Sequence, residues 1–306
     1  MSTTTTPAPE VPAQRSAPKA APSNARRARR RGERGPLATA LSHGVLAVAS
    51  LIALFPIVWL VYLSAGPDKD DYLHPGGIAS KATLDNYTYV LQHTGFLDWT
   101  KSTLVVALGT TLVGVLFAAT TGYAVSRMRF PGYRPLMWVL LLTQAFPIAV
   151  LIVPMYEIFS ELGLVDSYLG LVLVNCTTIV PYCTWLMKGY FDTVPVDIDE
   201  AGRIDGLSPF GTFWRLILPL AKPGIAVAAF YAFITAFAEV AFASTFLLDD
   251  AKYTFAVGLQ SFISEHDAQW NLMAATAVLI AIPVTAFFYL VQKHLVTGLT
   301  AGGTKG

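Results

Sequence analysis

The chain has 306 residues, of which 54% are hydrophobic and 13% are charged, and its formal net charge is +1. Soluble globular domains are roughly 45–50% apolar and about 25% charged. Each charge placed inside a bilayer costs roughly 2.5–3.5 kcal/mol on insertion scales. Such a low charge content is therefore typical of a membrane protein and argues against a soluble domain.

The N-terminal segment differs in composition from the rest of the chain. Residues 1–25 are rich in Thr, Pro, Ala and Ser and have no apolar periodicity, which predicts disorder. Six arginines between Arg26 and Arg34 then directly precede an apolar segment. A nucleic-acid-binding patch is one interpretation, but this position favours a cytoplasmic flank that contacts anionic membrane lipid. We therefore interpret residues 1–35 as a disordered basic cytoplasmic tail and residues 36–306 as a membrane domain.

Six apolar segments are each long enough to cross the hydrocarbon core of a bilayer, which takes about 20 helical residues. A spanning segment must satisfy its own backbone hydrogen bonds, so we predict an all-α integral membrane protein with six transmembrane helices. The first segment, of about 25 residues, exceeds the roughly 7–15 residues of a signal-peptide core, which predicts an uncleaved anchor. The predicted spans lie near residues 41–65, 103–125, 136–158, 168–190, 224–248 and 272–292.

The distribution of Lys and Arg predicts the orientation of these spans. With the N-terminus inside, the inner segments contain 17 of the 21 basic residues, and the outer loops contain the other four. Cytoplasmic loops carry an excess of Lys and Arg. We therefore predict a multi-pass protein of the cell membrane with both termini in the cytoplasm (N-in, C-in).

The predicted loops differ greatly in size. The polar loops 66–102 and 249–271 lie on the predicted outer side, and the loop 191–223 is the only sizeable one on the inner side. Because the other inner connections are short, a cytoplasmic partner protein has one obvious place to bind.

The inner loop carries the capping signals of two short helices. Asp197, with Glu200 three residues later, has the form of a capping box, and Gly206 is a favourable residue for a helix C-terminus. Ser208 is positioned to cap a second helix, with Pro209 at its first position. The sequence therefore predicts a helix–turn–helix that lies across the inner face of the membrane.

The second of these helices has one apolar stripe, and the first is strongly acidic. Phe210, Phe213, Trp214 and Ile217 follow the i, i+3, i+4, i+7 spacing, and Pro219 is expected to end the helix. An amphipathic connector that rests on lipid is one interpretation. Anionic headgroups would repel the first helix, so we favour docking to a protein. Its charged residues are Asp197, Asp199, Glu200, Asp205 and the single base Arg203.

A family resemblance is carried by Glu200-Ala201-Gly202, then Gly206, then Leu218-Pro219. This arrangement resembles the EAA loop of the permease subunits of ATP-binding-cassette importers. The Ile204-Asp205-Gly206 segment is common in the sugar-importing branch of that family. The chain departs from the family pattern at Gly202, where the family usually has Ala, and Leu216 fills the position of the family's Ile.

The resemblance implies that the first helix fits a cleft of a separate ATPase subunit and transmits closure of the ATPase dimer to the membrane helices. Glu200 would be a polar anchor, Ala201 and Gly202 would allow close approach, and Gly206 would form the turn. ATP and Mg²⁺ would bind to the partner, since the sequence has no G-x-x-x-x-G-K-[ST] phosphate loop, and we expect no cofactor on this chain. The implied ATPase-coupling residues are Glu200, Ala201, Gly202, Ile204, Asp205, Gly206, Leu218 and Pro219.

Toward the C-terminus the resemblance narrows to the maltose/maltodextrin permeases of this family, the smaller of the two permease subunits. It is carried by residues 234–240, 253–260 and 299–306. It implies a second permease subunit, a dimeric ATP-binding subunit and an extracytoplasmic sugar-binding protein that contacts the outer loop 249–271. It also implies that the C-terminal tail reaches between the ATPase subunits through Gly302, Gly303 and Lys305.

Several polar residues fall inside the predicted spans. Glu239 is a candidate for the translocation pathway, for a bond to the partner subunit, or for a position near the outer interface. Gln144 and Asn175 are expected to form interhelical hydrogen bonds. Cys176 and Cys183 are expected to be buried thiols, with no disulfide and no metal site.

The resemblance implies a permease subunit, not an enzyme, of an importer for maltose/maltodextrin-type oligosaccharides that couples ATPase closure to alternating access. An importer of another oligosaccharide, such as trehalose, is the main alternative. An ion-driven secondary transporter would usually show inverted repeats and paired ionisable groups at the bilayer midplane, and the sequence shows neither. The histidines are scattered and form no catalytic or metal-binding motif, which argues against a membrane enzyme.

Overall fold

The computed structural model describes residues 36–301, except residues 69, 72, 129 and 264–267. The described residues are almost entirely helical, which confirms the predicted all-α class. Their only strand-like pairing is an isolated bridge between Ile263 and Ala268. The chain divides into two compact units, Met1–Pro56 and Ile57–Gly306. The predicted tail 1–35 lies outside the described residues.

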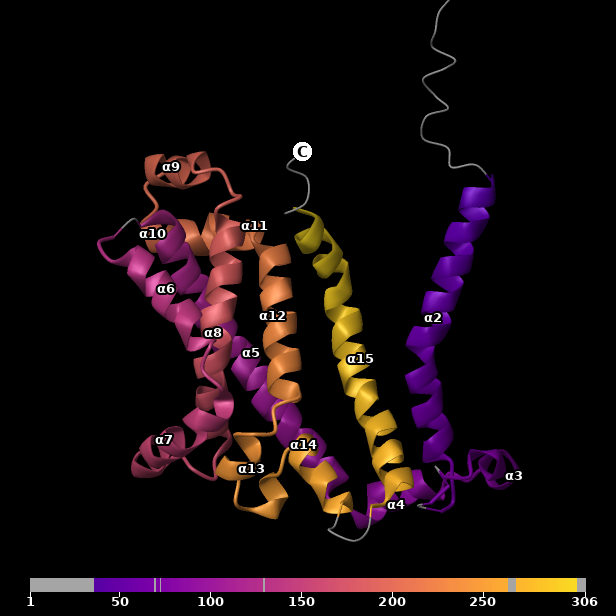
Figure 1. Ribbon diagram of the computed structural model, residues 1–306. Helices are drawn as coiled ribbons and strands as arrows, with labels where there is room; N and C mark the ends of the chain where they lie inside the picture. Colours follow the sequence, from indigo (N-terminus) through magenta and orange to yellow (C-terminus); the bar gives the residue numbers. More distant parts are fainter. Residues whose placement is uncertain (1–35, 69, 72, 129, 264–267, 302–306) are drawn as a thin grey trace, which may run out of the picture. The chain divides into compact units, whose positions relative to one another are not determined.

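Long apolar helices make up most of the described part of the chain (Figure 1). Four are long and apolar enough to cross a membrane, and the number is six if each of two sharply bent helix pairs counts as one span. The four are α2 (Pro36–Ser64), α5 (Phe96–Arg127), α8 (Tyr168–Phe191) and α15 (Trp270–Ala301).

The main hydrophobic core of the Ile57–Gly306 unit lies between α5, α8, α12 (Lys222–Phe237) and α15. Several of the buried positions are small, among them Ala118 and Ala119 on α5 and Ala228 and Ala232 on α12. Small side chains let membrane helices approach closely, because van der Waals packing rather than the hydrophobic effect holds such helices together. The core therefore combines close helix contacts at small residues with large buried side chains such as Phe191 and Phe233.

The predicted third span, 136–158, is not one continuous helix. It consists of α6 (Tyr133–Thr143) and α7 (Ile148–Glu161), which meet at an angle of 105°. Pro147 has no N–H to donate and precedes α7 with a ψ of 128°, in the extended region. The backbone N–H of Gln144 donates to the carbonyl of Leu141, and this tight turn ends α6. Pro147 was expected to kink one continuous helix, but it lies between two separate helices, α6 and α7.

The predicted fifth span, 224–248, is also wrong as a continuous helix, because α12 ends at Phe237. Glu239 caps the next short helix, α13 (Ala243–Phe246). Its two carboxylate oxygens accept the N–H groups of Phe242 and Ala243 at 2.6 and 3.0 Å. A side-chain oxygen that satisfies the free amides of a helix start stabilises that start. In this structure the carboxylate is therefore engaged within its own chain.

Short helices occupy the end of the Ile57–Gly306 unit at which α15 begins (Figure 1). They are η1 (Pro75–Gly77), α3 (Ile78–Lys81), α4 (Asp85–His93), η3 (Asp250–Lys252), α14 (Phe255–Gly258) and η4 (Leu259–Phe262). The two polar outer loops predicted from the sequence, 66–102 and 249–271, supply all of these elements. They are folded segments in the structure, and not simple connections.

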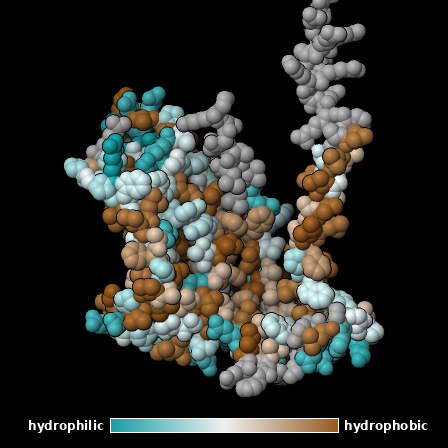
Figure 2. All heavy atoms as spheres, in the orientation of Figure 1, coloured by the Kyte–Doolittle hydropathy of each residue, from teal (hydrophilic) through white to brown (hydrophobic). Residues whose placement is uncertain are grey.

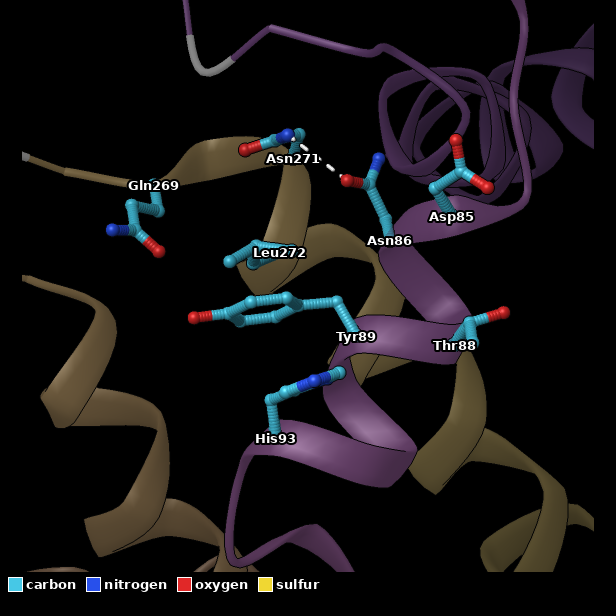
Figure 3. A pocket seen from close by; sticks show the side chains of 8 residues that line it. All are labelled: Asp85, Asn86, Thr88, Tyr89, His93, Gln269, Asn271 and Leu272. Atoms are coloured by element: carbon cyan, nitrogen blue, oxygen red, sulfur yellow. Dashed lines mark hydrogen bonds between the residues drawn. The ribbon is translucent and has the colours of Figure 1, made fainter.

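Two buried asparagines join α4 to the start of α15. The Nδ2 group of Asn86 donates to the carbonyls of Ser64 and Gly66 at 2.9 and 2.7 Å. The Nδ2 group of Asn271 donates to Oδ1 of Asn86 at 3.1 Å (Figure 3). Both asparagines also line an open groove of about 460 Å³ between α4 and α15. Their amides are occupied in holding the chain together at this end.

Polar and apolar side chains are unevenly distributed over the surface of the Ile57–Gly306 unit. On the face drawn in Figure 2, hydrophilic side chains gather around α9 and α10 and again at the opposite end, with a more hydrophobic zone between them. A zone of this kind suits a protein whose middle is surrounded by hydrocarbon and whose two ends are in water.

Candidate functional site

The segment singled out from the sequence forms a compact element, which we call the 197–220 hairpin. It consists of α9 (Asp197–Ile204), α10 (Pro209–Thr212), the π-helical turn η2 (Phe213–Ile217) and α11 (Leu218–Leu220). These elements lie together at one end of the molecule's Ile57–Gly306 unit (Figure 1). The predicted pair of short helices is therefore present.

The turn between the two helices has the predicted capping chemistry. Gly206 has a φ of +78°, a conformation that residues with a side chain rarely adopt. The amides of Gly206 and Leu207 bond to the carbonyls of Arg203 and Gly202 at 3.1 and 2.9 Å, which is a Schellman motif. Ser208 Oγ then accepts the N–H of Gly211 at 3.1 Å. Both predicted caps are confirmed.

The predicted capping box at the start of α9 is wrong. Val196 is the N-cap residue and has helical dihedral angles, and no side chain caps the helix. Asp197 is already helical, and the amides of Asp199 and Glu200 both bond to the carbonyl of Val196. The chain enters α9 through a turn that begins at Pro195, so a side-chain cap has no place to form.

A buried ion pair holds α9 to the end of α5. Asp199 Oδ2 lies 2.9 Å from Nε of Arg127, and the exposed fractions of the two side chains are only 5% and 9%. The hydroxyl of Tyr123 donates to Asp199 Oδ1 at 2.7 Å. Nη2 of Arg127 donates to the carbonyl of Val194 at 2.8 Å. Charge-assisted bonds of this kind are short and directional, so they fix the orientation of α9 relative to α5.

An aromatic cluster lies beneath this ion pair. The rings of Tyr123, Phe191 and Phe213 contact one another at centroid separations of 4.9 to 6.3 Å. Tyr123 belongs to α5, Phe191 to the end of α8 and Phe213 to η2. Because all three are buried, movement of the hairpin relative to α5 and α8 would disrupt packed aromatic contacts.

The predicted apolar stripe of the second helix divides into two sets. Phe213 and Ile217 are buried, whereas Phe210 is 67% exposed and Trp214 is also exposed. The intervening turn is π-helical, with the amide of Leu218 bonded to the carbonyl of Phe213 five residues earlier. Each set consists of residues four apart, so the four positions lie on two neighbouring faces of the helix and only one of these faces is buried.

The remaining EAA-loop residues separate into an inner and an outer face of α9. A Cβ atom on Gly202 would lie 2.8 Å from Oγ1 of Thr212, so glycine is needed for α9 to pack on α10. Gly202 therefore contacts its own hairpin. On the opposite face Ile204 is 86% exposed. Glu200, Ala201, Arg203 and Asp205 are also exposed.

The last two residues of the EAA pattern lie where the hairpin enters the bundle. Leu218 is partly buried against the main core, and Pro219 is exposed. Pro219 does not end the helix, which continues to Leu220 and is followed by an 82° bend before α12. A proline is tolerated here because it occupies the first turn of α11, where its missing N–H is not needed.

Little in the sequence indicates the roles of Tyr123 and Arg127 or the buried position of Asp199. Tyr123 and Arg127 lie 76 and 72 residues before Asp199 in the chain. Asp199 is one of several acidic residues in a helix whose other carboxylates are exposed. The only local signal was the position of Arg127 at the end of a predicted span, which charge counting assigned to a membrane flank.

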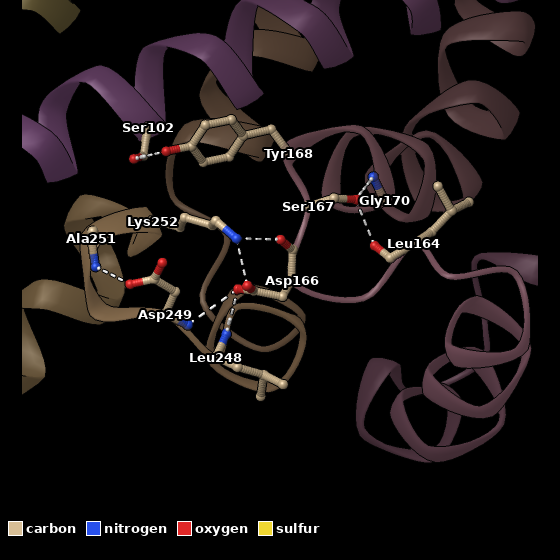
Figure 4. Close-up of polar contacts among 10 residues, drawn as sticks. All are labelled: Ser102, Leu164, Asp166, Ser167, Tyr168, Gly170, Leu248, Asp249, Ala251 and Lys252. Carbon is tan, nitrogen blue, oxygen red and sulfur yellow. Dashed lines mark hydrogen bonds and ion pairs between the residues drawn. The ribbon is translucent and has the colours of Figure 1, made fainter.

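A second polar cluster (Figure 4) lies beside α7 and α13, at the end of the Ile57–Gly306 unit opposite the hairpin (Figure 1). Asp166 connects α7 to α8 and has a φ of +56°, an unusual value for a residue with a side chain. Its Oδ1 accepts the N–H groups of Leu248 and Asp249 at 3.0 and 3.1 Å. Nζ of Lys252 contacts both the carboxylate and the carbonyl oxygen of Asp166. The predicted outer loop 249–271 is thus attached to the α7–α8 connection.

Asp166 and Lys252 shift each other's pKa. The hydrogen bond from Lys252 and the two backbone amides lower the pKa of Asp166 below its ordinary value. The same contact with Asp166 raises the pKa of Lys252. A carboxyl group with a lowered pKa stabilises the fold above its ordinary pKa, and that stabilisation is lost as the pH falls through the lowered value.

The other polar residues singled out from the spans have different outcomes. Nε2 of Gln144 donates to the carbonyl of Thr178 on α8 at 3.0 Å, so the predicted interhelical bond is confirmed. Asn175 is 1% exposed, and neither of its amide atoms has a partner in the described part of the chain, so that prediction is wrong. Cys176 and Cys183 are buried free thiols, as predicted. The tail residues Gly302, Gly303 and Lys305 lie outside the described residues.

Comparison with known proteins places this geometry in context. Residues 111–300 match the family described as "Binding-protein-dependent transport system inner membrane component". The maltodextrin transport system permease MdxG of Bacillus subtilis (strain 168) is 41% identical over 225 residues, which cover 73% of this chain and 81% of that protein. The trehalose transport system permease SugB of Mycobacterium tuberculosis (strain CDC 1551 / Oshkosh) is 33% identical over 259 residues, 83% of this chain and 93% of that protein.

A solved structure has the same fold. In the crystal structure of a bacterial ABC transporter involved in the import of the acidic polysaccharide alginate, one chain superposes with a TM-score of 0.70. The match covers 84% of this chain and 96% of that chain at 21% sequence identity. At this level of identity the likeness concerns the fold.

We predict that Asp199→Asn releases α9 from α5. The substitution keeps the size of the side chain but leaves the Arg127 guanidinium buried without a counter-ion, which costs roughly 3–5 kcal/mol. Amide hydrogen exchange across residues 197–207 should accelerate by about 100-fold or more, since each 1.4 kcal/mol is about tenfold. Asp197→Asn, the same change at an exposed position of α9, serves as the control. Unchanged exchange in Asp199→Asn would show that the ion pair does not hold the hairpin.

We also predict that Asp166 holds the 246–252 segment by its charge and its acceptor oxygens together. Asp166→Asn tolerates the positive φ and keeps an acceptor but loses the charge, whereas Asp166→Ala loses both. Exchange of the 246–252 amides should therefore increase in Asp166→Asn and increase further in Asp166→Ala. In the unmodified chain it should increase only below the ordinary pKa of aspartate, about 3.9. Loss of protection near neutral pH in the unmodified chain would contradict this account.

Proposed function

Because the chain belongs to the family of inner membrane components of binding-protein-dependent transport systems, we propose that it is one of two permease subunits of an ATP-driven oligosaccharide importer. Maltose/maltodextrin-type sugars are the proposed substrates, supported by 41% identity to a maltodextrin permease. Trehalose is the alternative, supported by 33% identity to a trehalose permease.

We propose six spans, formed by α2, α5, the broken pair α6 and α7, α8, α12 and α15, with the 197–220 hairpin outside the membrane. The excess of Lys and Arg at the end that carries the 197–220 hairpin supports a cytoplasmic position for this hairpin and for both termini. The opposite end, with loops 66–102 and 249–271, then faces outward, where a sugar-binding protein would dock. The second permease subunit and membrane lipid would cover the apolar helix faces between the two ends.

The buried Arg127–Asp199 pair is the observation that supports a coupling role most strongly. It gives α9 one face that is held to α5 and one face that is exposed. On the exposed face, Ile204 is an unusually accessible apolar side chain beside Glu200 and Asp205. An isolated acidic helix with an apolar tip suits a cleft on a dimeric ATP-binding subunit, which would carry the ATP, the Mg²⁺ and the hydrolytic activity.

In the proposed cycle, closure of the ATPase dimer displaces α9 and, through the ion pair, the end of α5. Gly206 and the π-helical turn η2 would preserve the shape of the hairpin during this movement. Leu218 and Pro219 would transmit the movement of the hairpin to α12. Each ligand must bind the two states with different affinity if it is to drive the change. ATP and the sugar-loaded binding protein should therefore favour the same state reciprocally. The tail residues Gly302, Gly303 and Lys305 are a proposed second contact with the ATPase.

An ion-driven transporter is less well supported. Such proteins use ionisable groups at the bilayer midplane. Glu239, the carboxylate expected within a span, is occupied by the amides of Phe242 and Ala243. Asp199 and Arg127 are paired at the end of α5.

We predict that Ile204→Asp and Glu200→Ala separate transport from membrane insertion. Both side chains are exposed, so the fold should be kept. Co-purification of the ATP-binding subunit should fall at least tenfold for Ile204→Asp, and ATP hydrolysis stimulated by the binding protein with maltose should fall with it. Glu161→Ala, on the exposed surface of α7, is the matched control for Glu200→Ala.

Comparison of maltose, maltotriose and trehalose as uptake substrates then distinguishes the two sugar classes. Normal uptake by Ile204→Asp would contradict the coupling role. Uptake by this chain in vesicles that contain no ATP-binding subunit would contradict the proposed function.

A further inference from the structure

The break between α6 and α7 opens a cavity of about 380 Å³ against α8. This volume falls in the range of roughly 300–1,000 Å³ typical of small-molecule sites. Thr177 and Thr178, which line it, lie near the midpoint of α8. The cavity is therefore well inside the membrane-spanning part of the chain, away from both polar ends.

The polar lining consists of Thr143, Gln144, Thr177 and Thr178. We propose that this cavity is a subsite for hydroxyl groups of the transported oligosaccharide, contributed by this subunit. The inference rests on the proposed function, since it identifies where this chain would contact the substrate.

Pro181 in α8 and the side chain of Gln144 leave hydrogen-bonding groups available at the cavity. Pro181 in α8 has no N–H, so the carbonyl of Thr177 lacks its usual helical donor. The Nε2 group of Gln144 donates one bond to the carbonyl of Thr178, and no partner is seen for its Oε1 atom among the described residues. The hydroxyls of Thr177 and Thr178 donate to carbonyls of their own helix and keep their lone pairs. These groups are mainly acceptors, which suits ligands that bring many O–H donors.

The chemistry of the cavity also limits the class of ligand. No lining residue is ionisable, which argues for a neutral ligand instead of an ion or a charged substrate. Phe146, Leu151 and Met155 supply apolar surface next to the polar groups. A sugar ring has an apolar C–H face and polar edges, so it matches a site with both kinds of surface.

The location of the break supports a pathway position. Non-helical backbone at membrane depth is tolerated only where protein covers it or where it lines a water-filled cavity. In transporters, discontinuous helices characteristically lie at the substrate site near the midplane. The break at residues 144–147 exposes backbone and the Gln144 side chain at such a depth. Lipid could not supply a donor for those acceptors that have no partner among the described residues, such as Oε1 of Gln144.

A thiol-protection experiment on the whole importer tests the proposal. The complex is purified with this chain carrying Cys176→Ala and Cys183→Ala, and Thr177→Cys introduces a reporter in the cavity. Maltotriose should slow methanethiosulfonate labelling at position 177 at least fivefold when the binding protein and a non-hydrolysable ATP analogue are present. Val153→Cys, exposed on α7 but outside the cavity, should show no protection.

Transport kinetics provide a second, independent test. Thr177→Val and Gln144→Leu should each raise the KM for maltotriose uptake about five- to tenfold, with little change in ATP hydrolysis stimulated by the unloaded binding protein. Gln292→Leu is the matched control, because Nε2 of Gln292 also donates to a backbone carbonyl but lies on α15. If the importer that carries Gln144→Leu fails to assemble, Thr177→Val and the thiol-protection assay still test whether the cavity binds sugar.

The outcomes distinguish this inference from the proposed function. Normal maltotriose uptake with no protection and an unchanged KM would overturn the inference and leave the proposed function intact. Cross-linking of position 177 to the second permease subunit in every state would also overturn it, because the cavity would then be a packing surface. If the wild-type complex takes up no oligosaccharide, the proposed function fails and this inference fails with it.

Discussion

The buried ion pair between Arg127 and Asp199 is the interaction on which the arrangement of the hairpin depends. Two charges removed from water are costly, and this cost is recovered only when both partners and their remaining hydrogen-bonding groups are satisfied. Tyr123 and the carbonyl of Val194 complete that set. Removal of any one partner would therefore leave a buried charge or polar group unsatisfied. The pair gives a short surface helix, which would be marginal by itself, one defined position on a membrane helix.

Several helices in the membrane part of the chain are interrupted. Pro147 separates α6 from α7, and Pro181 frees a carbonyl in α8. Glu239 starts a new helix shortly after α12 has ended. In water such interruptions would be solvated, but in a bilayer each must be compensated by protein, water or substrate. The positions of these breaks therefore indicate where a hydrophobic helical protein could accommodate a polar cargo.

Much of this architecture could be predicted from the sequence, because apolar length and capping chemistry are local properties. Four spans, the Schellman turn at Gly206 and the Ser208 cap all depend on neighbouring residues. The failures have non-local or competing causes. Continuous apolar segments concealed the breaks near Pro147 and after Phe237, because hydropathy is insensitive to backbone direction. The contact of Arg127 with Asp199 joins residues 72 positions apart, and no local pattern encodes it.

In the proposed importer, the Arg127–Asp199 pair makes α9 and the adjacent end of α5 move as one rigid piece when ATP binds to the partner subunit. This can be measured as the distance between spin labels at Asp197 and Met128, both exposed, in the assembled importer. The distance should stay the same between the nucleotide-free and ATP-bound states, while the distance from Asp197 to a label at Tyr289 on α15 should change. A change in the Asp197–Met128 distance on ATP binding would show that α9 moves independently of α5.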